Sequence, residues 1–154
     1  MKGNRALTLA ATAVMLLAAC TDGKLMHCYL PTDDEGWGRT DTLCFPLPDI
    51  PQTGEYPVSV GLRHGNRFPY TGLWVEAETR LSHPTAVRRD TLYIPITDTN
   101  GHPLQPGVSL HQHEVPLTTL HLQRGQKGNI RLHHIMMREV VPAISDVGLR
   151  ISLP

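Results

Sequence analysis

The sequence has few aromatic residues, no excess of either charge and only three cysteines. Aromatic side chains make up 5% of the 154 residues, and 14 Lys+Arg balance 14 Asp+Glu. A neutral chain lacks the basic field that supplies most non-specific affinity for nucleic acid, so nucleic acid is not an expected partner. The longest apolar run, between Arg5 and Cys20, is also shorter than the ~20 residues that a membrane-spanning helix needs.

Sequence signatures of catalysis are lacking as well. The chain has neither a Gly-x-Ser-x-Gly nucleophile elbow nor a glycine-rich phosphate loop. Ser109 lies near two histidines, but nothing marks its hydroxyl as activated. Glu76 and Glu78 alternate with Arg80, a pattern more typical of a solvated strand face than of a paired-carboxylate site. We therefore expect no catalytic residues and no enzymatic activity.

Nine histidines invite a metal interpretation. On a strand, His111 and His113 share one face and could bind one zinc ion. However, Glu114 would point to the opposite face, and the adjacent His133 and His134 diverge in the same way. We expect these histidines to pack or lie at the surface, with no metal and no cofactor.

The first twenty residues form a lipoprotein signal. Lys2 and Arg5 precede an apolar run that ends in Leu-Ala-Ala-Cys20, which resembles the lipobox of bacterial lipoproteins. Acylation of Cys20 with diacylglycerol, a palmitate-type modification, would anchor the chain in a lipid bilayer, because each buried CH₂ contributes about 0.8 kcal/mol. We predict a signal peptide over residues 1–19, a lipidated N-terminus and tether over 20–36, and one folded domain over 37–154. A short strand around Met26 to Leu30 is expected to interrupt the tether.

Two cysteines remain after this segment, Cys28 and Cys44. An exported compartment permits a disulfide, which would close a loop of about 15 residues and contribute around 3 kcal/mol. Cys44 also alternates with Leu43 and Phe45, so a free thiol on a strand is an equal alternative.

Turn residues and period-two alternation predict an all-β fold. The chain contains 13 glycines and 13 prolines, which favour turns between short segments. Apolar residues alternate with polar ones in six segments. We predict a single antiparallel β-sandwich or jelly roll of about seven to nine strands. The expected core residues are Val58, Val60, Leu62, Val75, Leu92, Ile94, Ile130, Leu132, Leu149 and Ile151.

Residues 39–47 and 88–96 agree at five of nine positions, including Pro46 and Pro95. Proline cannot donate a ladder hydrogen bond, so both segments are expected at sheet edges or bulges. Their similarity also suggests the hypothesis that they are equivalent strands of the two sheets.

The few aromatic residues are unevenly placed. Tyr70 and Trp74 lie close together in sequence, and Trp74 shares the polar strand phase of Glu76 and Glu78. Both are therefore candidate partner-binding residues, Trp74 being the stronger. The alternative is that the preceding loop folds over Trp74.

Short landmarks are spread along the mature chain in a particular order. They are Cys20, Gly36-Trp37, Asp41-Thr-Leu-Cys-Phe45, Gly61-Leu-Arg63, Phe68-Pro-Tyr-Thr-Gly-Leu-Trp74, Arg89-Asp-Thr-Leu92, Asp98-x-Asn-Gly101, His134-Ile-Met-Met-Arg138 and Pro142-Ala-Ile-Ser-Asp-Val-Gly-Leu149. Together they resemble the gliding-motility lipoprotein GldH family of Bacteroidota. The residues from Ser109 to His113 depart from the aromatic residues expected there in the family.

The resemblance implies an all-β, non-enzymatic envelope lipoprotein. Its implied partners are other motility lipoproteins or components of the type IX secretion machinery, and it supplies no catalytic residues. The segment after Cys20 lacks concentrated acids that resemble a surface-export signal, so we expect the periplasmic face of the outer membrane. A β-sandwich binding module for glycan or peptide is the alternative function.

Overall fold

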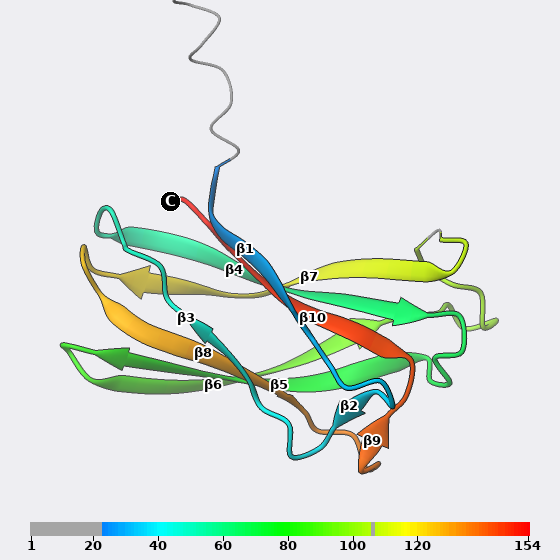
Figure 1. Cartoon of the computed structure of the whole chain (residues 1–154). Coiled ribbons are helices and arrows are strands. Elements are labelled where there is room, and N and C mark those ends of the chain that lie inside the picture. Colours follow the sequence, from blue (N-terminus) through cyan, green and yellow to red (C-terminus); the bar gives the residue numbers. More distant parts are fainter. Residues whose placement is uncertain (1–22, 106) are drawn as a thin grey trace, which may run out of the picture.

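The computed structural model describes residues 23–105 and 107–154, which form a two-layer β-sandwich (Figure 1). The first sheet has the strand order β1-β10-β4-β7 and the second β3-β8-β5-β6, while β2 and β9 form a small ribbon. All paired neighbours are antiparallel. The strands are β1 (Lys24–Pro31), β2 (Trp37–Gly38), β3 (Leu43–Pro46), β4 (Gly54–Gly65), β5 (Gly72–Ser82), β6 (Ala86–Pro95), β7 (Leu110–Leu122), β8 (Lys127–His134), β9 (Val140–Val141) and β10 (Ile144–Ser152).

The predicted antiparallel sandwich is confirmed, and its core follows the predicted alternation. Nine of the ten expected core residues are buried, and Leu92 is half-buried. Leu92 is less covered because β6 is an edge strand with a neighbour on one side only. Alternation therefore identifies the inward face of most strands, because one face of each is packed and the other is solvated.

The folded domain begins earlier than predicted. Residues 24–31, assigned to the tether, form the edge strand β1, which pairs with β10 along its length. Trp37, the predicted first residue of the domain, is fully buried. The ring of Tyr29 covers two neighbouring strands at Gly61 and Gly148, where an added Cβ would lie within 2.6 Å of the ring or its hydroxyl. Because Gly61 and Gly148 carry no side chain, the Tyr29 ring of β1 can lie over β4 and β10. The predicted signal peptide and Cys20 lie outside the described residues.

Two local features were not predicted from the sequence. The long strand β7 was missed, because two of its inward positions are histidines and Pro116 interrupts it. The ribbon strands β2 and β9 are two residues long, too short for a period to show.

The two proline-containing segments lie at sheet edges, as predicted. The strands β3 and β6 contain Pro46 and Pro95 and are the outer strands of the second sheet. They are opposite edges of one sheet, so the idea that they are equivalent strands of two sheets is wrong.

In the described part of the chain, no helix is long and apolar enough to cross a membrane.

The two described cysteines are free thiols, which corrects the disulfide alternative. Cys28 is half-buried on β1 in the first sheet, whereas Cys44 is exposed on β3 in the second. Burial raises the pKa of the Cys28 thiol.

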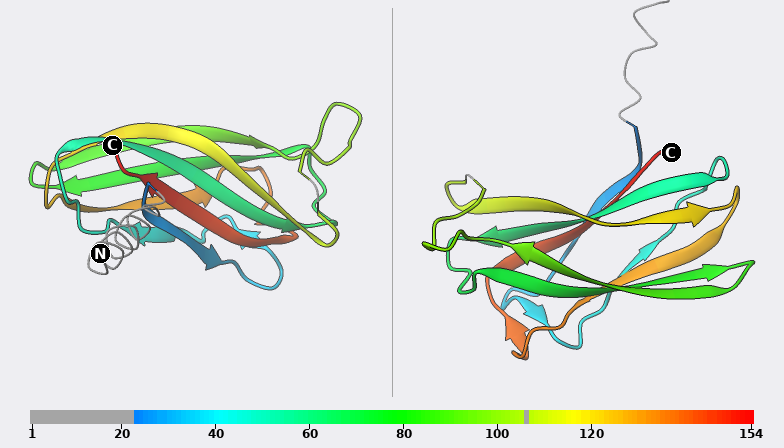
Figure 2. Two further views of the ribbon diagram at one scale, coloured as in Figure 1. Left: turned by 90° about the horizontal axis from the view of Figure 1, so that it is seen from above. Right: turned by 180° about the vertical axis from the view of Figure 1, so that it is seen from behind.

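The chain enters the domain from the side of the first sheet. β1 begins beside the C-terminal end, where the Leu153 amide donates to the Gly23 carbonyl at 2.7 Å. The second sheet forms the opposite layer, so its outer face is turned away from the point of entry (Figure 2).

Candidate functional site

Two exposed aromatic rings lie side by side on the outer face of the second sheet. Trp74 on β5 stands directly opposite Tyr93 on β6, with ring centroids 4.9 Å apart. Trp74 is 46% exposed and Tyr93 38%. An added Cβ at Gly72 would lie 2.2 Å from the Tyr93 hydroxyl, so that glycine makes room for the ring. The prediction that Trp74 is exposed on the polar strand phase is thus correct, and its partner Tyr93 was missed.

A third apolar side chain extends this surface. The Ile135 amide donates to the Trp74 carbonyl at 3.0 Å, and the Ile135 side chain is exposed. Because Val75 pairs with His134, the next residue, Ile135, stands opposite Trp74. We call Trp74, Tyr93 and Ile135 the aromatic patch.

Charged side chains cover the same sheet face beyond the aromatic patch. Glu78 lies between Arg80 and Arg89, and its side chain is only 10% exposed. Hydrogen bonds from Arg80 and then Arg89 hold the pKa of Glu78 below its usual value. Glu76 lies within ion-pair distance of Arg89 and His133. The carboxylates at 76 and 78 are therefore partners of cations, and Glu78 is more buried than the predicted solvated strand face.

Tyr70 is placed differently from Trp74. It lies in the loop before β5, half-buried, and its ring contacts Phe68 edge-on with centroids 5.7 Å apart. Phe68 in turn contacts His64. Tyr70 thus belongs to the packing of this loop, whereas Trp74 belongs to the exposed patch.

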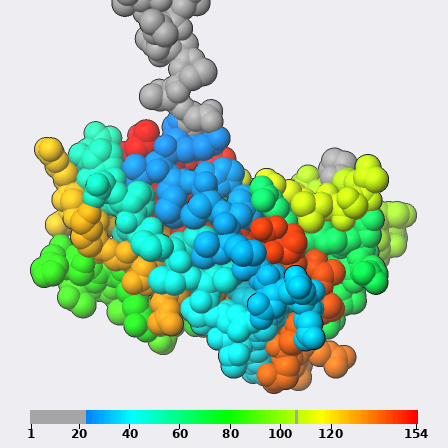
Figure 3. Space-filling model, in the orientation of Figure 1, coloured from blue at the N-terminus to red at the C-terminus, as the bar shows by residue number. Residues whose placement is uncertain are grey.

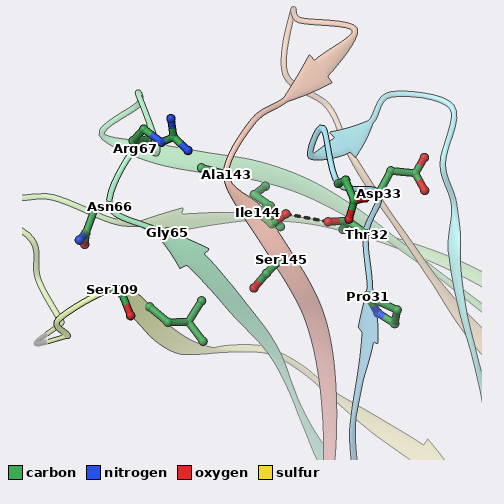
Figure 4. A pocket seen from close by; sticks show the side chains of 12 residues that line it. Pro31, Thr32, Asp33, Gly65, Asn66, Arg67, Ser109, Ala143, Ile144 and Ser145 are labelled. Carbon is green, nitrogen blue, oxygen red and sulfur yellow. Dashed lines mark hydrogen bonds between the residues drawn. The ribbon is translucent and has the colours of Figure 1, made fainter.

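A trough of about 580 Å³ crosses one end of the first sheet (Figure 4). Its walls come from the segment after β1, the loop after β4, the start of β7 and the start of β10. In the space-filling view, the segment after β1 lies against the start of β10 (Figure 3). The lining residues are Pro31, Thr32, Asp33, Asp34, Gly65, Asn66, Arg67, Ser109, Leu110, Ala143, Ile144 and Ser145.

Three buried histidines adjoin the trough. His64 stacks on both His111 and His113, with centroids 5.1 Å apart in each case. Nδ1 of His64 faces the Gly65 carbonyl at 3.0 Å, which only accepts, so this nitrogen donates. Nε2 of His64 then accepts the hydrogen bond from Nε2 of His113, 3.0 Å away. We call these three residues the histidine cluster.

His111 has an oxygen at each ring nitrogen. Nδ1 lies 2.8 Å from the Gln105 carbonyl, and Nε2 lies 2.7 Å from Oδ1 of Asn66. Exchanging the oxygen and nitrogen of the Asn66 amide would lose a hydrogen bond, because Nδ2 donates to the Val108 carbonyl at 2.7 Å. Both hydrogen bonds of His111 are therefore made together only when the ring carries two protons.

Burial lowers the affinity of the other two rings for protons. It brings the pKa of His113 to about 4, with further lowering by the charges of His64 and His111. Burial also lowers the pKa of His64, and the His111 charge acts in the same direction. The His113 ring is thus neutral at neutral pH, and the lowered pKa of His64 favours the neutral ring whose Nε2 accepts the hydrogen bond from His113.

The structure brings His111 and His113 together, but with His64 rather than Glu114. His133 and His134 diverge as predicted, since His133 is half-exposed while His134 is buried. Within the ranges 23–105 and 107–154, no group of three or more His, Cys, Asp or Glu side chains is arranged to hold a metal ion.

Sequence reasoning missed His64 and the trough. His64 occupies an inward position of β4, so the period-two pattern that gives Leu62 its inward position is the signal that could have found it. The trough had no such signal, because its residues come from four separate parts of the chain.

Comparison with known proteins identifies a family. Among solved structures, one described as the structure of Eiger TNF from S. frugiperda matches at 14% identity over 83% of this chain and 85% of that chain, with a TM-score of 0.26. A TM-score this low carries no argument. Comparison with curated proteins gives no match. The family model described as GldH lipoprotein matches residues 24–151, so the chain belongs to the GldH lipoprotein family.

Proposed function

We propose that this lipoprotein is a non-enzymatic component of the bacterial cell envelope that acts through protein contacts. Its family membership supports a lipoprotein. The signal segment and lipobox support acylation at Cys20, and the sequence after Cys20 favours the periplasmic face of the outer membrane. The partners we propose are other motility lipoproteins or type IX secretion components.

The observation that carries this proposal is the aromatic patch. Tryptophan and tyrosine are enriched among residues that dominate binding energy at protein interfaces. Trp74 and Tyr93 remain exposed although they pair with each other. The patch lies in the layer opposite the point where the chain enters the domain, so a protein anchored through its N-terminus would present it away from the membrane (Figure 2).

Crosslinking in native membranes tests the proposal. Envelope proteins crosslinked to the wild type should be lost in a Trp74→Ala/Tyr93→Ala variant, because truncating a hot-spot aromatic costs about 2 kcal/mol or more. Val87→Ala is the matched control, since Val87 is an exposed apolar residue elsewhere on β6. An unchanged set of partners in the double variant would contradict the proposal.

The anchor has its own test. Mass spectrometry of the membrane-extracted protein should find residues 1–19 absent and Cys20 acylated. An intact Met1, or a soluble form with an unmodified Cys20, would refute the anchoring.

The second candidate function is a binding module for peptide or glycan, and the trough favours it. A volume of about 580 Å³ falls within the usual range for ligand sites. Retention of partners together with loss of peptide or glycan binding, after substitutions in the trough, would support this alternative.

A further inference from the structure

We propose that the trough at the end of the first sheet binds an extended segment of a partner protein, about four residues long, with a basic side chain at one end and an acidic side chain at the other. This proposal deepens the second candidate function and does not depend on the aromatic patch. It rests on the dimensions of the trough, on its preformed walls and on the charges at its two sides.

The dimensions fit a short extended peptide. The trough is lined by the ends of β1, β10, β4 and β7, which are successive strands of one sheet. Three spacings of about 4.8 Å between neighbouring strands give a length of about 14 Å, and four extended residues span about 13 Å. A segment lying across the strand ends would therefore reach from the β1 side to the β7 side.

The walls are joined by hydrogen bonds, so no large rearrangement is needed to form the trough. On the β1 side, the Thr32 hydroxyl donates to the Ile144 carbonyl at 2.7 Å, as Figure 4 shows. In the middle, the Gly65 amide donates to the Ala143 carbonyl at 2.8 Å. On the far side, Asn66 is held by His111 and by the Val108 carbonyl. Preformed walls reduce the ordering cost of binding.

Ala143 adds a sign of local strain in the same wall. Its φ of 63° lies in the left-handed region, which residues with a Cβ rarely adopt. Such conformations cluster at ligand-binding and active sites, where the surrounding structure holds them. Here the bond from the Gly65 amide holds the Ala143 carbonyl in the wall.

The charges have opposite signs at the two sides. Asp33 and Asp34 follow β1, and Arg67 follows β4. Within residues 23–105 and 107–154, none of these three side chains forms an ion pair. Ile144 on β10 lies between the two sides, and Leu110 on β7 adds exposed apolar surface beyond β4. The trough is thus a dipolar site with unpaired charges at the surface.

This charge pattern favours a peptide over a glycan. Two residues that are three positions apart in an extended peptide are separated by about 10 Å, so one short peptide can carry both signs of charge at that spacing. A neutral glycan has no charge to match Arg67 or the two aspartates. No aromatic ring is among the described residues that line the trough, so the flat apolar face of a sugar would find no stacking partner.

Fluorescence anisotropy with labelled peptides tests the proposal on the detergent-extracted full-length protein. The dipolar probe is Gly-Lys-Ala-Leu-Glu-Gly, the neutral probe replaces Lys and Glu by Gln, and the dicationic probe replaces Glu by Lys. We expect the dipolar probe to bind at least tenfold more tightly than the neutral probe at low salt. High salt should reduce the difference, because the charges are exposed.

Substitutions make the test specific to the trough. Arg67→Gln and Asp33→Asn/Asp34→Asn should each remove most of the preference for the dipolar probe. Arg67→Glu makes the trough wholly acidic and should invert the preference towards the dicationic probe. Arg124→Glu is the matched control, because Arg124 is exposed in the turn between β7 and β8, outside the trough.

Three results would overturn the proposal. They are equal binding of all probes to the wild type, an unchanged preference in Arg67→Glu, and displacement of the dipolar probe by a neutral oligosaccharide, which would indicate a glycan site. The substituted residues are exposed, and circular dichroism checks that each variant is folded. A Trp74→Ala/Tyr93→Ala variant should keep probe binding, which separates this test from that of the aromatic patch.

Discussion

Acidification should destabilise the protein through His113, the most strongly shifted histidine of the cluster. The His113 pKa lies at about 4 in the folded chain, against a value of 6.5 for an unperturbed histidine. Its side chain lies on the inward face of β7, and the residue is 4% exposed. The unfolded state therefore takes up a proton on this ring at a higher pH than the folded state does.

The magnitude follows from the two pKa values. The stability that the neutral ring provides is fully present above pH 6.5 and declines as the pH falls towards 4, because the unfolded state then binds more protons. Between pH 7.5 and pH 5, this difference amounts to about 2 kcal/mol of unfolding free energy. Burial also lowers the pKa values of His64 and His134, so their contributions have the same sign.

Urea denaturation of the full-length protein at a series of pH values measures the effect. His113→Gln keeps an N–H that can donate towards His64 but removes the titration. The loss of stability between pH 7.5 and pH 5 should be about 2 kcal/mol smaller in this variant than in the wild type, whatever its stability at pH 7.5. Thr118→Ser is the control, because Thr118 lies on the same strand and carries no ionisable group, so this variant should keep the wild-type pH dependence. Equal slopes for His113→Gln and the wild type would refute the reasoning.

Four further predictions follow from packing, thiols and metal. Leu132→Ala should lower the free energy of unfolding by about 2–5 kcal/mol, because Leu132 is fully buried, and a loss below 1 kcal/mol in urea denaturation would contradict its place in the core. Gly148→Ala should cost about 1–3 kcal/mol through its clash with Tyr29, and a Tyr29→Ala background should relieve much of that cost, whereas strictly additive losses would argue against the contact. In the native protein, Cys44 should react with a thiol reagent faster than Cys28, whose pKa is raised by burial, and a disulfide found by mass spectrometry would overturn the free-thiol assignment. Dialysis against a strong chelator should leave the melting temperature unchanged, and a drop of many degrees that zinc restores would show a structural metal at the histidine cluster.

The sequence by itself determined the sandwich and most of its core. Residues such as Val60, Leu132 and Leu149 lie inward because each belongs to an alternating run, and alternation is a local property that survives in any antiparallel sheet with one solvated face. The edge positions of β3 and β6 were also predictable, since the missing N–H of Pro46 and Pro95 excludes a central ladder.

Only the tertiary structure decided the sites. The pairing register of β5 and β6 places Tyr93 opposite Trp74. The trough collects residues from four segments of the chain, and its hydrogen-bonded pair Thr32 and Ile144 is 112 positions apart. The inward histidines of β7 form a cluster because His64 of β4 stacks on both of them. Local alternation shows which face of a strand is buried, but it carries no information about which strands become neighbours. That choice depends on long-range packing, and the aromatic patch, the histidine cluster and the trough all depend on it.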